Sequence, residues 1–143
     1  MFLGEYQHAI DDKGRISIPV KFRHALKAGA VVTRGLDRSL VIYAMKEWNV
    51  LAKRLAALPI SEPNSRAFAR LMLAGAMDVH VDAQGRIPIP EYLRLYAGLQ
   101  KSIVVAGLFN RLEVWDADTW AATQAKTENE SNAIAEHLSA LGI

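Results

Sequence analysis

Apolar and polar residues alternate along several short stretches of the chain. The alternation from Tyr6 to Ile10, and again around Val79 and Val81, leads into a glycine-containing turn that is followed in both places by the motif Ile-x-Ile-Pro. A period of two is typical of a half-buried strand, and two such stretches around a short turn predict a β-hairpin. We therefore expect one hairpin at each of the two turns.

Each predicted hairpin ends at a proline, which suits the first turn of a helix. Apolar residues then recur with the spacing i, i+3, i+4, which predicts a short helix with one buried face. A further pair of strands around a tight turn follows in both places, ending at Tyr43 and at Trp115. The prolines are Pro19 and Pro90, and the apolar helix positions are Phe22, Ala25, Leu26 and Leu93, Tyr96, Ala97.

Two further segments have a helical pattern. Residues 47–58 and 65–76 are amphipathic and are separated by Pro59 and Pro63, which predicts two helices and a structured connection. The C-terminal segment begins like a helix and has a polar, acidic middle. Its last dozen residues offer a single apolar stripe, so we expect a helix that docks on a neighbour or frays. The stripe consists of Ile134, Leu138 and Leu141.

The two halves of the chain repeat one another. Residues 10–23 and 81–94 share seven identities in fourteen positions, and residues 31–48 align with residues 103–120 after one inserted residue. Such a register indicates two copies of one supersecondary unit. We place the units at residues 5–47 and 76–119, with a helical connection at 48–75 and a helical and polar tail at 120–143.

Composition narrows the class of protein. Of the 143 residues 51% are hydrophobic and 22% are charged, which is typical of a soluble globular protein, and there is no cysteine for a disulfide or thiolate site. The sequence has neither a signal-peptide pattern at its start nor an apolar run long enough to span a membrane. We expect a cytoplasmic protein without a membrane partner.

Positive charge is concentrated in the first part of the chain. The net charge is +2, but residues 1–60 hold ten Lys and Arg against five Asp and Glu, whereas residues 61–143 hold seven against ten. This asymmetry is compatible with an anionic partner and equally with an ordinary solvated surface.

The repeated turns carry the candidate chemistry. If Gly14 and Gly85 take the left-handed conformation that closes such a loop, Asp11 faces Arg15, and Asp82 faces Arg86. Inward-pointing isoleucines on the following strand place both arginines on the exposed face. A cross-strand ion pair that fixes the register, worth roughly 0.2 to 1 kcal/mol, is one interpretation of each pair.

A second interpretation is recognition of a nucleic acid. Arg23 and Arg94 recur just downstream, and the first unit adds Lys13, Lys21 and Lys27. An arginine side chain is a planar fork that fits phosphate or guanine, so an exposed group of arginines near a protruding turn suits the reading of a duplex.

Catalysis and metal binding are disfavoured. The four histidines have no ligand-like spacing. Asp11 and Asp82 are expected at exposed turns beside a cation that keeps them ionised, whereas acid and base catalysis needs a shifted pKa. We expect no enzyme activity, no metal site and no cofactor.

The turns "DDKGR" and "DAQGR", together with "MFLGEY", "LMLAGAMDV" and "GLFNRLEVWD", resemble the MraZ family of bacterial transcriptional regulators over about residues 1–125. The resemblance implies an α+β, mainly β fold, in which tandem AbrB-like swapped-hairpin units form one pseudo-twofold β-barrel with flanking helices. It also implies ring-like homo-oligomers, association with the nucleoid, and binding of short direct repeats in double-stranded DNA upstream of the division and cell-wall gene cluster, which is usually repressed.

Carried onto this chain, the resemblance places DNA contact on Asp11 to Arg15 and on Asp82 to Arg86. Lys13 and Lys21 have no basic counterpart in the second unit, where Gln84 and Tyr92 stand, so the resemblance does not imply equal use of the two turns. Two other functions remain as alternatives. One is an AbrB-like antitoxin, and the other is a ring-forming scaffold whose arginines contact neighbouring subunits.

Overall fold

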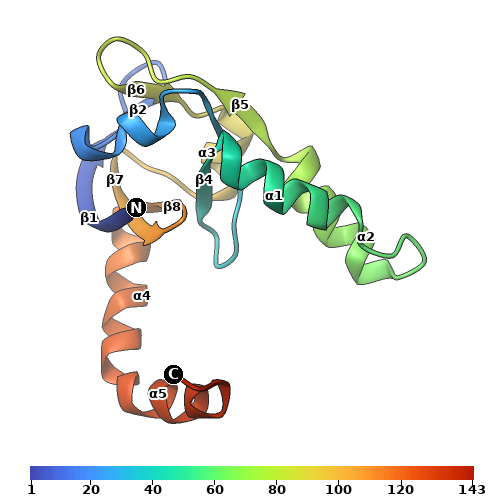
Figure 1. The fold of residues 1–143 in the computed structure, drawn as a ribbon. Helices are drawn as coiled ribbons and strands as arrows, with labels where there is room; N and C mark the ends of the chain where they lie inside the picture. The colour runs from blue at the N-terminus through green and yellow to red at the C-terminus, as the bar shows by residue number, and fades with distance from the viewer.

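The computed structural model describes all 143 residues and contains one large antiparallel sheet and a separate two-stranded ribbon (Figure 1). The large sheet has six strands in the order β1-β7-β8-β4-β3-β5, and the ribbon pairs β2 with β6. The strands of the sheet are β1 (Phe2–Ala9), β7 (Ser102–Phe109), β8 (Leu112–Asp116), β4 (Leu40–Ala44), β3 (Ala30–Arg34) and β5 (Met77–Val79). The ribbon consists of β2 (Arg15–Ser17) and β6 (Arg86–Pro88).

Strands of one half of the chain pair with strands of the other half. By the sequence repeat, β1 corresponds to β5, β2 to β6, β3 to β7 and β4 to β8. The strand β1 pairs along its whole length with β7, β5 pairs with β3, and β2 pairs with β6. The strand order of the large sheet therefore reads the same from both ends, and the two halves are interleaved.

The predicted local hairpins are wrong in their pairing. The stretch from Tyr6 to Ile10 does turn back at Gly14, but β1 and β2 form ladders with β7 and β6 and not with each other. The reason is burial. Ile16 and Ile87 face each other in the ribbon and both are fully buried, so pairing across the halves puts both apolar faces into one core.

The segments after the two prolines differ in form. Two 3₁₀ turns, Val20–Phe22 and His24–Leu26, follow Pro19, whereas an α-helix, α3 (Glu91–Tyr96), follows Pro90. Phe22, Leu26, Leu93 and Ala97 are buried as predicted. Ala25 is exposed, and Tyr96 is half-buried because its hydroxyl reaches the carbonyl of Gly35.

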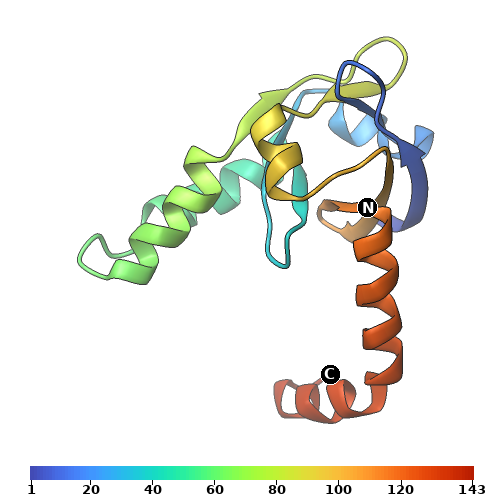
Figure 2. The ribbon, with the colours of Figure 1, turned by 180° about the vertical axis from the view of Figure 1, so that it is seen from behind.

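Two helical arms extend from the sheets in different directions (Figures 1 and 2). The first arm follows β4 and contains α1 (Met45–Ala56), α2 (Pro63–Ala69) and a π-helical turn (Arg70–Ala74). The second arm follows β8 and contains α4 (Ala117–Asn129), α5 (Ser131–Leu138) and a final 3₁₀ turn (Ser139–Leu141). The two helices predicted around Pro59 and Pro63 are confirmed, with Pro63 in the first turn of α2.

The core lies between the ribbon, the large sheet and the post-proline segments. It is one cluster of 18 buried apolar residues drawn from both halves. The α+β, mainly β class is confirmed. The expected closed barrel is not, because the six-stranded sheet is open and β1 and β5 are its two edge strands. The unit boundaries at 5–47, 48–75, 76–119 and 120–143 stay predictions.

No helix in the chain combines the length and the apolar character that a membrane crossing requires.

Candidate nucleic-acid interface

The two repeated turns are built in the same way around an aspartate. One carboxylate oxygen of Asp11, Oδ1, accepts hydrogen bonds from the backbone N–H groups of Lys13 and Arg15, both at 2.9 Å. In the second turn Oδ1 of Asp82 accepts from the N–H groups of Gln84 and Arg86 at the same distance. An aspartate that bonds the backbone two residues on is a well-known turn former, so each aspartate fixes the path of its loop.

The second oxygen of each aspartate holds the arginine that ends the turn. Arg15 Nε donates to Asp11 Oδ2 at 2.7 Å, and Arg86 Nε donates to Asp82 Oδ2 at 3.0 Å. The ion pairs that the sequence predicted are therefore present. The side chains of Arg15 and Arg86 are 28% and 27% exposed, so they are less exposed than the strand alternation alone predicted.

The two turns lie next to each other at one end of the ribbon. Arg86 Nη1 is 3.8 Å from Asp11 Oδ2, although Asp11 belongs to the other half of the chain. Arg86 Nη2 also donates to Gln84 Oε1 at 3.2 Å. The pairing of β2 with β6 thus brings both aspartates and both arginines into one cluster. The two loops that carry these residues lie side by side in Figure 2.

The carboxylates in this cluster are stabilised in their charged form. The N–H of Arg15 is the main group that holds the pKa of the Asp11 carboxyl below its ordinary value, and the Arg15 side chain adds to this effect. The N–H of Arg86, followed by its side chain, lowers the pKa of Asp82 in the same way. Both turns therefore keep an acceptor for their arginine down to acidic pH.

Each turn is also supported by the other half of the chain. The carbonyl of Gly14 accepts from the N–H of Ile89 at 2.9 Å, and the carbonyl of Gly85 accepts from the N–H of Ile18 at 2.8 Å. Because both glycines have φ near +80°, at 76° and 80°, a residue with a side chain would be strained there. The left-handed glycines that the sequence predicted are confirmed.

Arg23 and Arg94 lie against these glycines in a crossed arrangement. A Cβ atom at Gly85 would lie 2.0 Å from the guanidinium carbon of Arg23, and one at Gly14 would lie 2.1 Å from Nη1 of Arg94. Arg23 Nε donates to the carbonyl of Ile18 at 2.9 Å, and Arg94 Nη1 donates to the carbonyl of Ile89. Each of these arginines thus supports the turn of the opposite half, a role that the sequence did not predict.

The lysines of the first half occupy different settings. Lys13 is exposed at the tip of its turn. The Lys21 ammonium lies 5.1 Å from the ring centre of Tyr6 and 5.3 Å from that of Phe22, which is the geometry of a cation–π contact. Nothing in the sequence indicates the contact with Tyr6, because Tyr6 lies far from Lys21 along the chain.

No group of three or more His, Cys, Asp or Glu side chains is placed to hold a metal ion. Four arginines and Lys13 lie around one pair of turns, and two carboxylates orient two of the arginines.

Comparison with known proteins shows which protein family the chain is similar to. The family model described as "MraZ protein, putative antitoxin-like" matches residues 1–71 and again residues 72–140. Proteins named "Transcriptional regulator MraZ" are 48% identical in Herpetosiphon aurantiacus and 46% identical in Acetivibrio thermocellus, each over 143 residues and the full length of both chains. The protein of that name in Thermomicrobium roseum is 45% identical over 141 residues, which is 99% of each chain.

Proposed function

The chain belongs to the MraZ family, and on that premise we propose that it regulates transcription by binding a specific sequence of double-stranded DNA through its two turns. The observation that carries the proposal is the joining of both Asp-x-x-x-Arg turns in one cluster, where Arg86 approaches Asp11 of the opposite half. One ribbon end then presents two oriented arginines to one stretch of duplex. The proposed activity is binding, and it requires no catalytic group and no cofactor.

The geometry of the arginines suits base recognition. In each turn the aspartate accepts from Nε and so restrains the guanidinium. The terminal nitrogens of Arg15 make no hydrogen bond within the chain, whereas Arg86 Nη2 would have to leave Gln84 Oε1 to reach a base. A guanidinium held in this way can donate two parallel hydrogen bonds to O6 and N7 of guanine in the major groove. Lys13 at the tip supplies a charge for the phosphate backbone, which contributes affinity without sequence preference.

The other residues that the sequence predicted to contact DNA differ in the contacts they make within the chain. Arg23 and Arg94 each use a nitrogen to hold a backbone carbonyl, so we propose that they act on DNA chiefly by positioning the turns. Lys21 rests on aromatic rings and is proposed to face the phosphate backbone. The family resemblance supports the finer proposal: a ring-like homo-oligomer at the nucleoid in the cytoplasm, bound to short direct repeats upstream of the division and cell-wall gene cluster, which it represses.

Selection of bound duplexes from a random pool, followed by affinity measurements on the selected sequence, tests the proposal. We expect Arg15→Ala and Arg86→Ala each to weaken specific binding by about 1 to 3 kcal/mol, the value of a bidentate base contact. Lys126→Ala on the distant α4 serves as the control and should leave affinity unchanged. Wild-type affinity in both arginine variants at several salt concentrations would overturn the assignment of the turns.

A further inference from the structure

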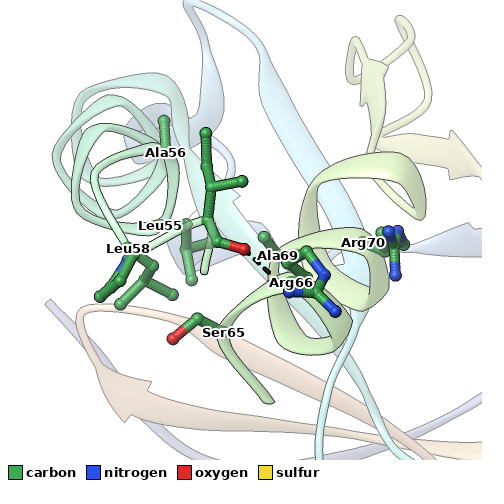
Figure 3. Close-up of a pocket in the computed structure, with 9 residues that line it drawn as sticks. Leu55, Ala56, Leu58, Ser65, Arg66, Ala69 and Arg70 are labelled. Carbon is green, nitrogen blue, oxygen red and sulfur yellow. Dashed lines mark hydrogen bonds between the residues drawn. The ribbon is translucent and has the colours of Figure 1, made fainter. Parts of the chain in front are cut away.

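The hollows beside the two helical arms differ in size and in charge. The hollow between the end of α1 and α2 has a volume of about 210 Å³, and its Arg66 already donates to the carbonyl of Ile60 at 2.9 Å (Figure 3). The hollow at the base of α4 has about 460 Å³, and both of its charged residues, Glu5 and Glu113, are acidic. A further hollow of about 380 Å³ contains charges of both signs. Small-molecule sites usually have volumes of about 300 to 1,000 Å³, so this last hollow combines a suitable size with a varied set of partners.

The turn hollow, as we call this 380 Å³ space, is formed by the turn between β3 and β4, the first arm and the start of β8. Side chains from both halves of the chain therefore meet in it. Leu36 is 63% exposed and Phe68 is 37% exposed, so apolar surface is open to a ligand at these two positions. The apolar lining consists of Leu36, Val41, Leu51, Phe68 and Met72.

The backbone around the turn hollow is unusual in two places. Asp37 and Arg38 have φ of 57° and 62°, as in a type I′ hairpin turn, although neither is a glycine or an asparagine. The guanidinium of Arg38 lies 5.4 Å from the ring centre of Tyr96, whereas the exposed Asp37 lines the hollow. Met72 belongs to the π-helical turn. Left-handed residues other than glycine and π-helical turns both occur frequently at functional sites.

Opposite charges lie beside a tyrosine hydroxyl in the turn hollow. Arg111 is half-buried and forms no ion pair, and its Nη1 donates to Asn110 Oδ1 at 3.1 Å. Glu113 uses one oxygen, Oε1, to accept from Trp115 Nε1 at 2.9 Å. Burial raises the pKa of the Tyr43 hydroxyl, and Arg111 opposes this shift while Glu113 adds to it. The guanidinium and the carboxylate therefore both act on the space around this hydroxyl.

These charges select the class of ligand. A simple anion would pair with Arg111 but would also meet the carboxylates of Asp37 and Glu113, and a simple cation would leave Arg111 without a partner. A charge that is taken out of water without a partner is unfavourable. A ligand with one ammonium and one carboxylate group can satisfy both signs, and the five apolar side chains require that its remainder be apolar.

We propose that the turn hollow binds a small zwitterion with an apolar body, which is the chemistry of a free apolar amino acid or an apolar dipeptide. The ligand carboxylate pairs with Arg111, its ammonium group pairs with Asp37 and Glu113, and its apolar part packs on Phe68 and Met72. The turn between β3 and β4 points away from the two loops of the ribbon (Figures 1 and 2). The proposal therefore concerns a second site and does not depend on DNA binding.

Titration calorimetry on the full chain without DNA tests the site with matched ligands. L-phenylalanine and L-leucyl-L-phenylalanine carry both charges, whereas hydrocinnamate lacks the ammonium group and phenethylamine lacks the carboxylate. Each singly charged ligand should bind about tenfold more weakly than L-phenylalanine, because it loses hydrogen bonds to a charged group. Two results would overturn the proposal. One is equal affinity for the three phenyl compounds, and the other is no saturable binding of either zwitterion at about 10 mM, where a ligand with a Kd of about 1 mM is nearly saturating.

Variants locate the binding. Arg111→Gln should weaken L-phenylalanine about tenfold and leave phenethylamine unchanged, and since Arg111 forms no ion pair, the variant should keep its circular dichroism and melting transition. Arg70→Gln, which changes an arginine of the hollow in Figure 3, is the control and should bind both ligands like the wild type. Equal weakening of both ligands by Arg111→Gln would contradict the assigned role. If no zwitterion binds and Leu36→Ser with Phe68→Ser lowers the native mass, the hollow is a contact between copies of the chain and the proposal is wrong.

Discussion

The two halves of the chain share their interior and differ at their periphery. In both halves the first strand pairs with the third strand of the other half, and the ribbon joins their second strands. After the fourth strand the halves diverge. The helix α1 is followed by α2 and a π-helical turn whose Met72 carbonyl accepts from the hydroxyl of Thr33 at 2.6 Å. In contrast, α4 leads away from the body and α5 lies at its far end (Figure 1). A residue inside the interleaved pairing has to fit its own half and the other half. A residue outside this pairing has no such requirement, so the two halves can differ there.

The two turns also differ within their common plan. Arg15 engages one carboxylate, while Arg86 engages Asp82, approaches Asp11 and donates to Gln84. The first turn carries Lys13 where the second carries Gln84. The first turn is therefore more cationic with a less restrained arginine, and the second is more tightly held. The predictions below test how far this difference extends.

The largest expected effect is a loss of stability when the glycine shared by the two turns is replaced. Gly14→Ala and Gly85→Ala should each lower the free energy of unfolding by about 3 kcal/mol, because a side chain in the left-handed region costs roughly 1 to 2 kcal/mol and the displaced arginine loses a charged hydrogen bond worth about 1.5 to 3 kcal/mol. Urea unfolding provides the measurement.

A matched control separates these two causes. Gly98 has φ of 59°, but a Cβ atom there would meet nothing within 4 Å. Gly98→Ala should therefore show the backbone cost alone. If all three variants lost the same stability, the contact between each turn and the opposite arginine would have no energetic weight.

The next largest effect is expected when the arginine that supports the turn of the opposite half is removed. Arg23→Ala removes the support of Gly85, and Arg94→Ala removes the support of Gly14. We expect each change to cost about 1 to 3 kcal/mol and to speed amide exchange in the turn of the opposite half more than in its own. Hydrogen exchange resolved by residue checks this expectation. Faster exchange confined to the turn in the same half would contradict the crossed arrangement.

A smaller effect is expected from the two aspartates. Their pKa values are lower in the folded chain than the ordinary value near 3.9, so their stabilising contribution is present above about pH 4 and is lost as the pH falls through the folded pKa. Asp11→Asn should lower stability at pH 7 more than Asp82→Asn, because Asp11 lies near two arginines. Melting curves between pH 2 and pH 7 should show each variant converging on the wild type at the acidic end.

The smallest effect concerns the tips. Lys13→Gln should reduce the slope of log affinity against log salt by about 0.9, the contribution of one neutralised phosphate, and Gln84→Lys should increase it by the same amount. The pair of variants exchanges the tip chemistry of the two turns. A change that depends on the DNA sequence would instead identify Lys13 as a reader of bases.

The local features of this fold were predictable, and the pairing was not. Alternation placed Ile16 and Ile18 inward, and Pro63 marked the start of a helix, because both signals act over a few residues. The partner of β1 lies about one hundred residues further on, since Phe2 pairs with Phe109. Periodicity carries no information on which strand pairs with β1, so the prediction that β1 pairs with the nearest strand was wrong.

The same difference between local and long-range contacts applies to the candidate site. The Asp-x-x-x-Arg spacing identified Asp11 with Arg15 and Asp82 with Arg86, since each pair forms within five residues. The supporting positions of Arg23 and Arg94 depend on contacts across the halves. The sequence nevertheless holds a signal for these positions, because a glycine and a downstream arginine recur together in both copies. Each glycine lacks the Cβ atom that would overlap with the arginine of the other half.

Interleaving sets the order in which the chain can complete its structure during synthesis. The pairing of Phe2 with Phe109 and of Ala9 with Ser102 means that β1 has no ladder partner until most of the chain has left the ribosome. Contacts between residues so distant in sequence slow folding, and unpaired strand edges in unfinished chains promote aggregation. A nascent first half therefore has to be kept soluble until the second half arrives. Products that end before residue 100 would lack four of the 18 core residues and the only ladder partner of β1, which leaves that strand exposed to proteases.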